Sequence, residues 1–278
     1  MIEGGWFQDL SDRDLDGAIR AITDGQADTP GDWPTQAVET GFSEDQAEYY
    51  EFLHEATVAA ASTQASSKEQ ATDQQLVHAV RTMDDLSETV NELAERAAEW
   101  AGSLFGESEQ GLDYVLAVAE REPQSPVEAE VIDLARSVRE LENRRQRVRT
   151  FVENQAPAVA PNLSTLAGPL LAARLIALAG GLQSLARKPS GTVQVLGAED
   201  ALFAHLEGHA PSPKHGIIFT HEYVRGTRNE KRGSAARALA GKLSIAARID
   251  QYRGEPHPEL EAELDERIET IRAGGEGE

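Results

Sequence analysis

Four histidines lie close together in the last third of the chain, and their spacing could support metal chemistry. His205 and His209 are four residues apart, so they would share one face of a helix, and His215 and His221 follow shortly after. Two histidines at this spacing occur in zinc sites, where the metal activates a water molecule. No carboxylate stands at a convincing ligand spacing, and the chain has no cysteine. We therefore predict no metal site, with a metal-dependent enzyme using His205 and His209 as the alternative.

Motifs of common catalytic sites are absent from the sequence. It contains no GxSxG, HExxH, P-loop or GxGxxG pattern. The GAED sequence at 197–200 has no second carboxylate or histidine placed for acid–base work. We predict that the protein is not an enzyme, with no catalytic residues and no cofactor.

Positive charge is concentrated in residues 157–253, which contain 12 Lys and Arg residues against 6 Asp and Glu residues. The whole chain has a net charge of −22. A cationic segment in so acidic a protein is usually kept for a phosphate-bearing partner, so we predict an RNA-binding surface here. The residues expected to contact RNA or a protein bound to it are Lys188, Gly197, Ala198, Glu199, Lys214, His215, His221, Arg225, Arg228, Lys231, Arg232, Arg237, Lys242 and Arg248.

Several of these residues have structural alternatives. Lys188 could cap a helix end, and Arg248 could pair within the chain with Asp250 or Glu199. Arg237, Gly241, Ser244 and Arg248 step by four, three and four, which predicts a cationic stripe along one helix. Gly197 and Ala198 are small enough to let a partner approach closely. The apolar Phe203 and Leu206 are expected in the core rather than stacked on bases, and the helix that carries Phe203 is expected to pack against a protein partner.

Three sequence blocks resemble the Nop domain family: GAEDALF at 197–203, PKHGIIF at 213–219 and RGSAARALAGKLSIAARID at 232–250. Residues 160–199 match the same domain without a gap, and residues 73–100 resemble the family's long-helix region. The family includes the archaeal counterpart of the eukaryotic Nop fifty-six and fifty-eight proteins. One position departs from the family pattern, because Asp200 stands where the family usually has lysine.

The resemblance implies a non-catalytic scaffold of the box C/D guide-RNA ribonucleoprotein, which directs ribose 2′-O-methylation of rRNA or tRNA. Its implied partners are the box C/D guide RNA, a kink-turn-binding subunit similar to a ribosomal protein, and the methyltransferase fibrillarin. The alternative, besides the metal enzyme, is a coiled-coil adaptor that binds no RNA.

Apolar residues recur in steps of three and four over 76–104 and again over 127–152, which predicts two long packed helices. One hairpin covers only part of each apolar stripe, so the seam could also bind a second copy. Packing within one chain is the alternative, and the resemblance favours a homodimer. The residues expected at the dimer contact are Val131, Leu134, Val138, Leu141 and Val148.

The predicted fold is mainly α. It consists of a shortened N-terminal region at 1–61, of the type that docks fibrillarin in the family, a long antiparallel two-helix coiled-coil stalk at 62–155, an all-helical Nop domain at 156–253, and a C-terminal helix with a disordered tail at 254–278. A short strand at 4–10 would give the N-terminal region a small α/β element. One helix is expected to be capped by Ser11, and a second is expected to begin at Ser43. Residues 163–179 are expected to form one buried helix.

Composition bears on habitat and compartment. The chain has 48 acidic and 26 basic residues, of which only 5 are lysine, and this surplus of carboxylates predicts a salt-rich cytoplasm such as that of a halophilic archaeon. No apolar run reaches about 18 residues, and the N-terminus lacks a signal pattern. We therefore expect a soluble, cytoplasmic protein with no membrane partner.

Overall fold

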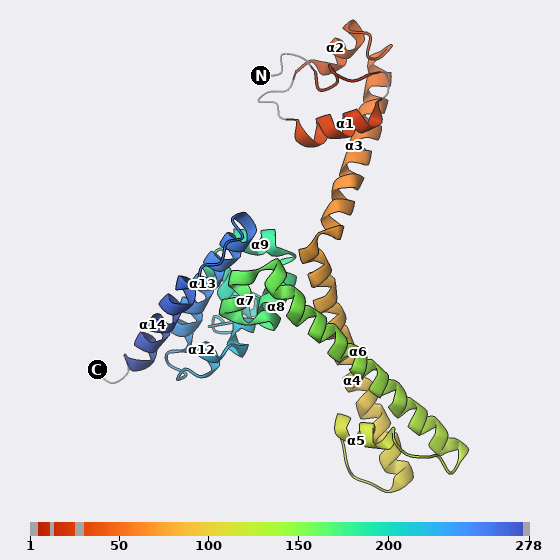
Figure 1. Ribbon diagram of the computed structural model, residues 1–278, viewed down its shortest axis with the longest axis vertical. Coiled ribbons are helices and arrows are strands. Elements are labelled where there is room, and N and C mark those ends of the chain that lie inside the picture. The colour runs from red at the N-terminus through yellow and green to blue at the C-terminus, as the bar shows by residue number, and fades with distance from the viewer. Residues whose placement is uncertain (1–4, 12–13, 26–30, 275–278) are drawn as a thin grey trace. The chain divides into compact units, whose positions relative to one another are not determined.

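Every regular element in the described part of the chain is a helix (Figure 1). This computed structural model describes residues 5–11, 14–25 and 31–274. The chain divides into two compact units, residues 1–71 and 72–278, which we call unit 1 and unit 2. The expected mainly α fold is confirmed.

Unit 1 is a small helical unit built around aromatic rings. Its helices are α1 (Leu15–Asp24), α2 (Trp33–Glu39) and α3 (Gln46–Gln70). The indole Nε1 of Trp6 donates a hydrogen bond to the Tyr49 hydroxyl at 3.0 Å. Burial raises the pKa of that hydroxyl. The rings of Phe7, Phe42 and Phe52 pack around this pair and complete the cluster.

The helices of unit 1 start at other residues than expected. α1 follows Asp14, whose carboxylate accepts the N–H of residue 17 at 2.9 Å, so Ser11 is not the cap. α3 follows Asp45, whose carboxylate accepts the N–H of residue 48 at 2.8 Å, so the helix does not begin at Ser43. In both places a carboxylate nearer the helix provides the acceptor, and its charge also favours the positive end of the helix dipole.

The strand expected over 4–10 is wrong within the described residues, because 6–9 form a turn. Residue 4 lies outside the described part. Trp6 and Phe7 are adjacent in sequence, and both rings pack into the same aromatic cluster. A strand would direct them to opposite faces. Within the described residues, unit 1 therefore has no α/β element.

Unit 2 combines two long helices with a group of shorter ones. α4 (Thr72–Phe105) and α6 (Pro126–Val159) lie side by side, and α5 (Leu112–Val118) packs on both near one end (Figure 1). The remaining elements are α7 (Pro161–Ala167), α8 (Pro169–Ala179), α9 (Leu182–Arg187), α10 (Ser190–Val195), α11 (Glu199–Leu206), η1 (Ile217–Thr220), α12 (Glu222–Arg225), α13 (Arg232–Tyr252) and α14 (Glu259–Ala273). The two long helices expected from the apolar spacing are confirmed.

The residues expected at a dimer contact mostly face the chain's own interior. Val131 and Val138 are 0% exposed in the seam between α4 and α6. Leu134 and Leu141 are partly buried against the same seam, and Val148 packs on the main core of unit 2. These side chains therefore hold the hairpin together, and dimerisation through them stays a prediction.

An ion pair lies beside this seam. The Arg145 guanidinium donates two hydrogen bonds to the Glu142 carboxylate, at 2.7 and 2.6 Å. Both side chains are largely covered, with 21% and 12% of their surfaces exposed. The hydrogen bonds to Arg145 lower the pKa of Glu142 below its usual value. Arg145 is thus held by its own helix.

Replacing Val138 with aspartate is expected to unfold the hairpin rather than merely separate two copies. The carboxylate would lose its hydration in a seam that offers no partner, at a cost of several kcal/mol. Urea unfolding followed by circular dichroism should show this loss. The matched control is Val127→Asp, at a 50% exposed position in the first turn of α6, which should change stability by less than about 0.5 kcal/mol. Equal stability of the two variants would contradict the seam.

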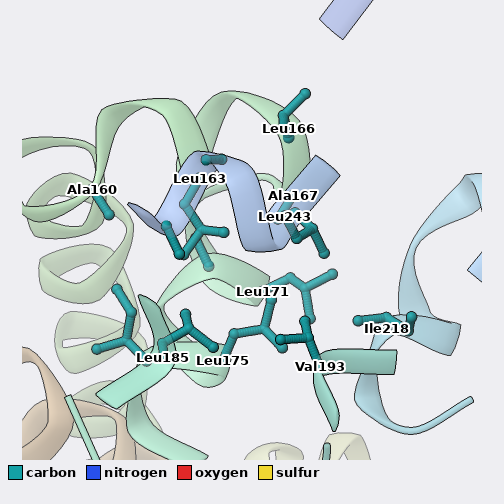
Figure 2. Packing of buried hydrophobic residues seen from close by; sticks show 14 of the residues in the cluster. Ala160, Leu163, Leu166, Ala167, Leu171, Leu175, Leu185, Val193, Ile218 and Leu243 are labelled. Atoms are coloured by element: carbon teal, nitrogen blue, oxygen red, sulfur yellow. The ribbon is translucent and has the colours of Figure 1, made fainter. Parts of the chain in front are cut away.

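The main core of unit 2 lies where the shorter helices meet. Leu171 and Leu175 of α8 lie in one cluster with Val193 of α10, Ile218 of η1 and Leu243 of α13 (Figure 2). All five are almost completely buried. This core fixes the position of the turn before α11 and of the segment that leads into η1.

The single helix expected over 163–179 is in fact two. α7 ends at Ala167, Gly168 adopts a φ of +77°, and α8 begins at Pro169, so the axes bend by 117°. Pro169 has no N–H to donate to the preceding turn, and it disfavours helical backbone geometry at the residue before it. That residue is Gly168, and glycine adopts a positive φ more easily than any other residue. Among the described residues, no single helix is long and apolar enough to span a membrane, and α7 and α8 meet that test only as a bent pair.

Candidate nucleic-acid interface

Hydrogen bonds tie the PKHG block and the residue after it to the residues directly before the GAED block. The Gly216 N–H donates to the Gln194 carbonyl, and the Ile217 N–H donates to the Leu196 carbonyl, each at 2.8 Å. The side-chain amide of Gln194 donates to the Lys214 carbonyl at 2.7 Å. The segment that carries Lys214 therefore lies against the turn that starts α11.

Gly197 shapes this turn. Its φ is +81°, and a Cβ there would lie 3.3 Å from both the Ile217 Cβ and the Leu178 Cδ1. The Gly197 N–H donates to the Glu199 carboxylate at 2.9 Å. The lack of a side chain at Gly197 is thus required by neighbours within the chain. Gly197 and Glu199 remain exposed and Ala198 half-exposed, so a partner can still reach the turn.

Helix α11 presents two large apolar side chains to solvent. Phe203 is 63% exposed and Leu206 is 71% exposed. Their expected place in the core is therefore wrong. No residue of α11 is buried, because the helix is short and the core of unit 2 does not cover it. Exposed apolar residues of this size, side by side on one helix, are typical of a contact with another macromolecule.

Three of the predicted RNA-contacting cations are bound within the chain, and one of them, Arg232, donates to the carbonyls of Thr227 and Arg225. The Arg248 guanidinium donates to the carbonyls of Ala186 and Lys188, at 3.1 and 3.2 Å, and so caps the C-terminus of α9. This internal role differs from the alternative pairing with a carboxylate. The Lys242 ammonium pairs with Glu263 of α14. Arg248 and Lys242 stabilise the fold through these internal partners, and an RNA phosphate would have to compete with those partners for them.

The cationic stripe expected along α13 is interrupted. Ser244 is 1% exposed, and its hydroxyl donates to the Ala240 carbonyl at 2.8 Å. Arg237 lies on the exposed side of the helix. The steps of four and three placed Ser244 on the exposed face, but the core side of α13 is wide enough to include it. Arg237 and Arg248 are therefore separated on the surface.

His221 also has a structural position. Its Nδ1 accepts the Tyr223 N–H at 3.2 Å and caps the start of α12. Burial lowers the pKa of its imidazole, and a hydrogen bond with the Leu166 backbone partly offsets that effect. The ring is thus fixed between α12 and the end of α7.

Six predicted cations have no ion pair or side-chain hydrogen bond among the described residues. They differ from Arg248 and Lys242 in that their charges are available to a partner. These six are Lys188, Lys214, Arg225, Arg228, Lys231 and Arg237. RNA contact by them stays a prediction.

The two histidines expected on one helix face do not share a helix, because α11 ends at Leu206 and His209 lies beyond it. The His205 Nδ1 shares a hydrogen bond with the Ala210 carbonyl at 2.9 Å, and the His209 Nδ1 lies 3.5 Å from the Glu207 carboxylate. Within residues 5–11, 14–25 and 31–274, no group of three or more His, Cys, Asp or Glu side chains could hold a metal ion. Nothing in the geometry favours the metal-dependent alternative.

The fold combines a helical core, a two-helix stalk and two turns joined by hydrogen bonds. Comparison with known protein families identifies the class of protein to which it belongs. The family model described as "Nop: snoRNA binding domain, fibrillarin" matches residues 107–271, more than half of the chain. The chain belongs to the Nop family.

Individual relatives agree with this assignment. The chain is 43% identical over 183 residues to an uncharacterised NOP5 family protein of Methanocaldococcus jannaschii, covering 66% of this chain and 41% of that protein. It is 33% identical over 215 residues to nucleolar protein 58 of Schizosaccharomyces pombe, covering 64% and 42%. A crystal structure of a fibrillarin/Nop5p complex matches with a TM-score of 0.55 and 28% identity over 91% of each chain. The chain thus spans less than half the length of these curated relatives.

The exposed pair on α11 is the feature that sequence reasoning missed. Apolar periodicity shows which residues share a helix face, but it does not show whether that face is covered. One signal was present. Gly197 and Gly208 flank α11 closely, so the helix has only 8 residues and little length with which to pack against a core.

Proposed function

We propose that this protein is a non-catalytic core subunit of a box C/D guide-RNA ribonucleoprotein. It binds guide RNA together with a small kink-turn-binding protein and positions fibrillarin for ribose 2′-O-methylation. Membership of the Nop family supports the RNA-binding part of this proposal. The likeness to the protein chain of a fibrillarin/Nop5p complex supports the methyltransferase partner.

One observation carries the proposal furthest. Gln194 of α10 binds the Lys214 carbonyl, which holds Lys214 against the helix that precedes α11, and α11 presents Phe203 and Leu206 to solvent. A cation beside exposed apolar side chains suits a surface formed jointly by RNA and protein, because phosphate needs charge and a protein partner needs apolar contact area. The pattern fits recognition of a protein already bound to RNA.

Unit 1 is the proposed docking site for fibrillarin. It is joined to unit 2 through the end of α3, whose residues 61–70 are all exposed. Within the described residues it is small and helical, with an aromatic cluster at its centre. The corresponding match to the fibrillarin/Nop5p structure extends over most of the chain and supports this assignment.

Two copies are proposed to associate through the stalk. Val131 and Val138 are covered by the chain itself, so the more exposed apolar side chains of the hairpin are the ones open to a second copy. Trp100 and Phe151, 41% and 46% exposed, are available for that contact. Large exposed apolar residues at such positions favour association.

Reconstitution tests the proposal. The protein is mixed with a kink-turn RNA, a recombinant kink-turn binder and fibrillarin, and the mixture is followed by gel shift, light scattering and methyl transfer to a target RNA. We expect a complex of higher mass that methylates the target only when all components are present. Assembly without the RNA, or methyl transfer that does not need this chain, would contradict the proposal.

Arg225 and Arg228 are expected to contribute strongly to RNA binding. Both are exposed, and neither has a side-chain partner among the described residues. A charge-assisted hydrogen bond to phosphate contributes roughly 1.5–3 kcal/mol, so replacing both with alanine should weaken binding at least tenfold. Gel shift measures the affinity, and circular dichroism should be unchanged.

The matched control is Arg267→Ala, on the exposed side of α14, which should bind as the parent does. Unchanged affinity of the Arg225 and Arg228 double variant would move the RNA contact to Lys231 and Arg237.

A further inference from the structure

A second feature of the PKHG block is a stack formed by the side chains of His215, Phe219 and Arg232. The imidazole of His215 stacks on the ring of Phe219, with centroids 4.6 Å apart and planes inclined by 18°. The guanidinium of Arg232 lies over the same Phe219 ring, 5.4 Å from its centroid. Lys214 precedes His215 and is exposed. The Phe219 ring is thus covered by an imidazole and a guanidinium, and the charge of Lys214 acts on the same imidazole.

The stack is held in place from both sides. On one side, Gly216 follows His215 and is tied to Gln194, and a Cβ at Gly216 would lie 2.1 Å from the Leu196 carbonyl oxygen. On the other side, the Arg232 Nε donates to the Thr227 carbonyl at 3.0 Å. Groups that are already ordered lose little conformational entropy when they bind a ligand. The arrangement is that of a prepared binding site.

Uncompensated positive charge surrounds His215. Burial lowers the pKa of its imidazole, and the charges of Arg232 and Lys214 lower it further. Its own segment contributes Lys214, and α13 contributes Arg232. The neighbouring α10 and η1 contain no ionisable residue. Helix α12 packs on η1 and carries Glu222, which is not among the charges that act on His215. Among the described residues, the cluster therefore has donors for an anion and no carboxylate that acts on the His215 ring.

We propose that Lys214, His215 and Arg232 bind one phosphodiester group of the RNA, and that the His215 imidazole takes up a proton from solvent when it does so. This inference rests on the proposed function, because it names the chemical group that this part of the surface binds. Arg232 is bound by carbonyls through part of its guanidinium and keeps further N–H donors. Lys214 supplies an ammonium, and protonated His215 supplies an N–H.

The expected pH dependence follows from the charges. A phosphate offsets Lys214 and Arg232, so the pKa of His215 is higher in the complex than in the free protein. A site that gains a proton on binding has its highest affinity below the free pKa. Affinity then falls as the pH rises through the window between the free and the bound pKa. Each unit of difference between the bound and the free pKa of His215 corresponds to about a tenfold change in affinity for the RNA.

Two measurements test the site. The first is NMR titration of labelled histidine rings in the full chain, free and bound to a kink-turn RNA with its recombinant binder, with His215→Gln used to assign the resonance. We expect the pKa of His215 to rise by about one unit or more on binding. The second is gel shift between pH 6 and pH 8. The parent should lose affinity about tenfold as the pH rises, and His215→Gln should show a nearly flat profile.

Control variants separate the site from general effects. His54→Gln changes an exposed histidine in unit 1 and should keep the parent's pH profile. Lys214→Ala should reduce the rise in the pKa of His215 while the protein stays folded, because Lys214 is exposed. RNA alone and the kink-turn binder alone are run as separate arms.

Each outcome of these measurements either supports or overturns the phosphate site. If RNA binds but the pKa of His215 does not move, or if His215→Gln keeps the parent's pH profile, the phosphate site is overturned and the proposed function stands. If the binder alone raises the pKa as much as the full complex does, the occupant is a carboxylate of that protein and the phosphate assignment fails. If no RNA binds at any pH, the proposed function fails and the site fails with it.

Discussion

Replacing Asp250 with alanine is expected to lower the free energy of unfolding by about 2–4 kcal/mol. The Asp250 carboxylate accepts the backbone N–H groups of Asn162 and Leu163, at 3.0 and 2.8 Å, and the side-chain amide of Asn162 at 2.6 Å. It therefore caps α7 from a distant helix, α13. Without it, two donors at the start of a helix and one amide lose their acceptor, each in a partly buried place.

The effect should extend beyond α7. Asn162 is 5% exposed, and its amide also donates to the Glu255 carbonyl at 2.9 Å, while its Oδ1 accepts the His257 N–H at 2.6 Å. This one side chain links α7, α13 and the segment before α14. Removing Asp250 therefore loosens three elements that close one side of the core.

Urea unfolding measures the loss, with two further variants for comparison. Asp250→Asn keeps the shape and one acceptor oxygen, so it should be less damaging than alanine. Glu269→Ala, exposed on α14, should leave stability within about 0.5 kcal/mol of the parent. If Asp250→Ala were as stable as Glu269→Ala, the cap would contribute nothing.

The long helices could be predicted from sequence because their signal is local. Apolar residues that recur in steps of three and four over some thirty positions leave few alternatives to a packed helix. The break at Gly168 and Pro169 was also visible in the residues, but the apolar character of the flanking stretch outweighed it in the prediction. Backbone geometry decides here, because neither the glycine φ nor the missing proline N–H fits a continuous helix.

The position of the cationic surface could be predicted from the sequence, but the division of its cations into bound and free ones could not. Charge counts identify the segment, and they do not show which cations are already bound. Arg248 is bound by the carbonyls of Ala186 and Lys188 at the C-terminal end of α9, which lie 62 and 60 residues away in sequence. Lys242 is bound by Glu263 on a helix that follows later. Such long-range partners have no local signature, so the division into bound and free cations needed the fold.

Phe203→Asp combined with Leu206→Asp is expected to give the largest loss of binding, at least about 100-fold for the complex of RNA and kink-turn binder. Apolar side chains that dominate an interface each contribute about 2 kcal/mol or more. Aspartate also places an unpaired charge in a contact that excludes water. Both positions are exposed in the free protein, so circular dichroism and urea unfolding should match the parent.

Salt separates this apolar contribution from the electrostatic one. At about 1 M salt the screening length is only about 3 Å, so long-range attraction to phosphate contributes little. A protein of net charge −22, predicted to work in concentrated salt, would depend on direct contacts such as those of α11. We expect binding to naked RNA to collapse as potassium chloride rises to molar concentration, while binding to the RNA with its protein partner declines gradually.

The variant pair makes that comparison decisive. The Phe203 and Leu206 double variant should lose the salt-resistant binding and behave with the complex as the parent behaves with naked RNA. Val127→Asp on the stalk adds the same charge at another exposed apolar position and should bind as the parent does. Equal, steep losses with salt for the parent on both targets would mean that charge alone holds the RNA, and that the exposed face of α11 has a different partner.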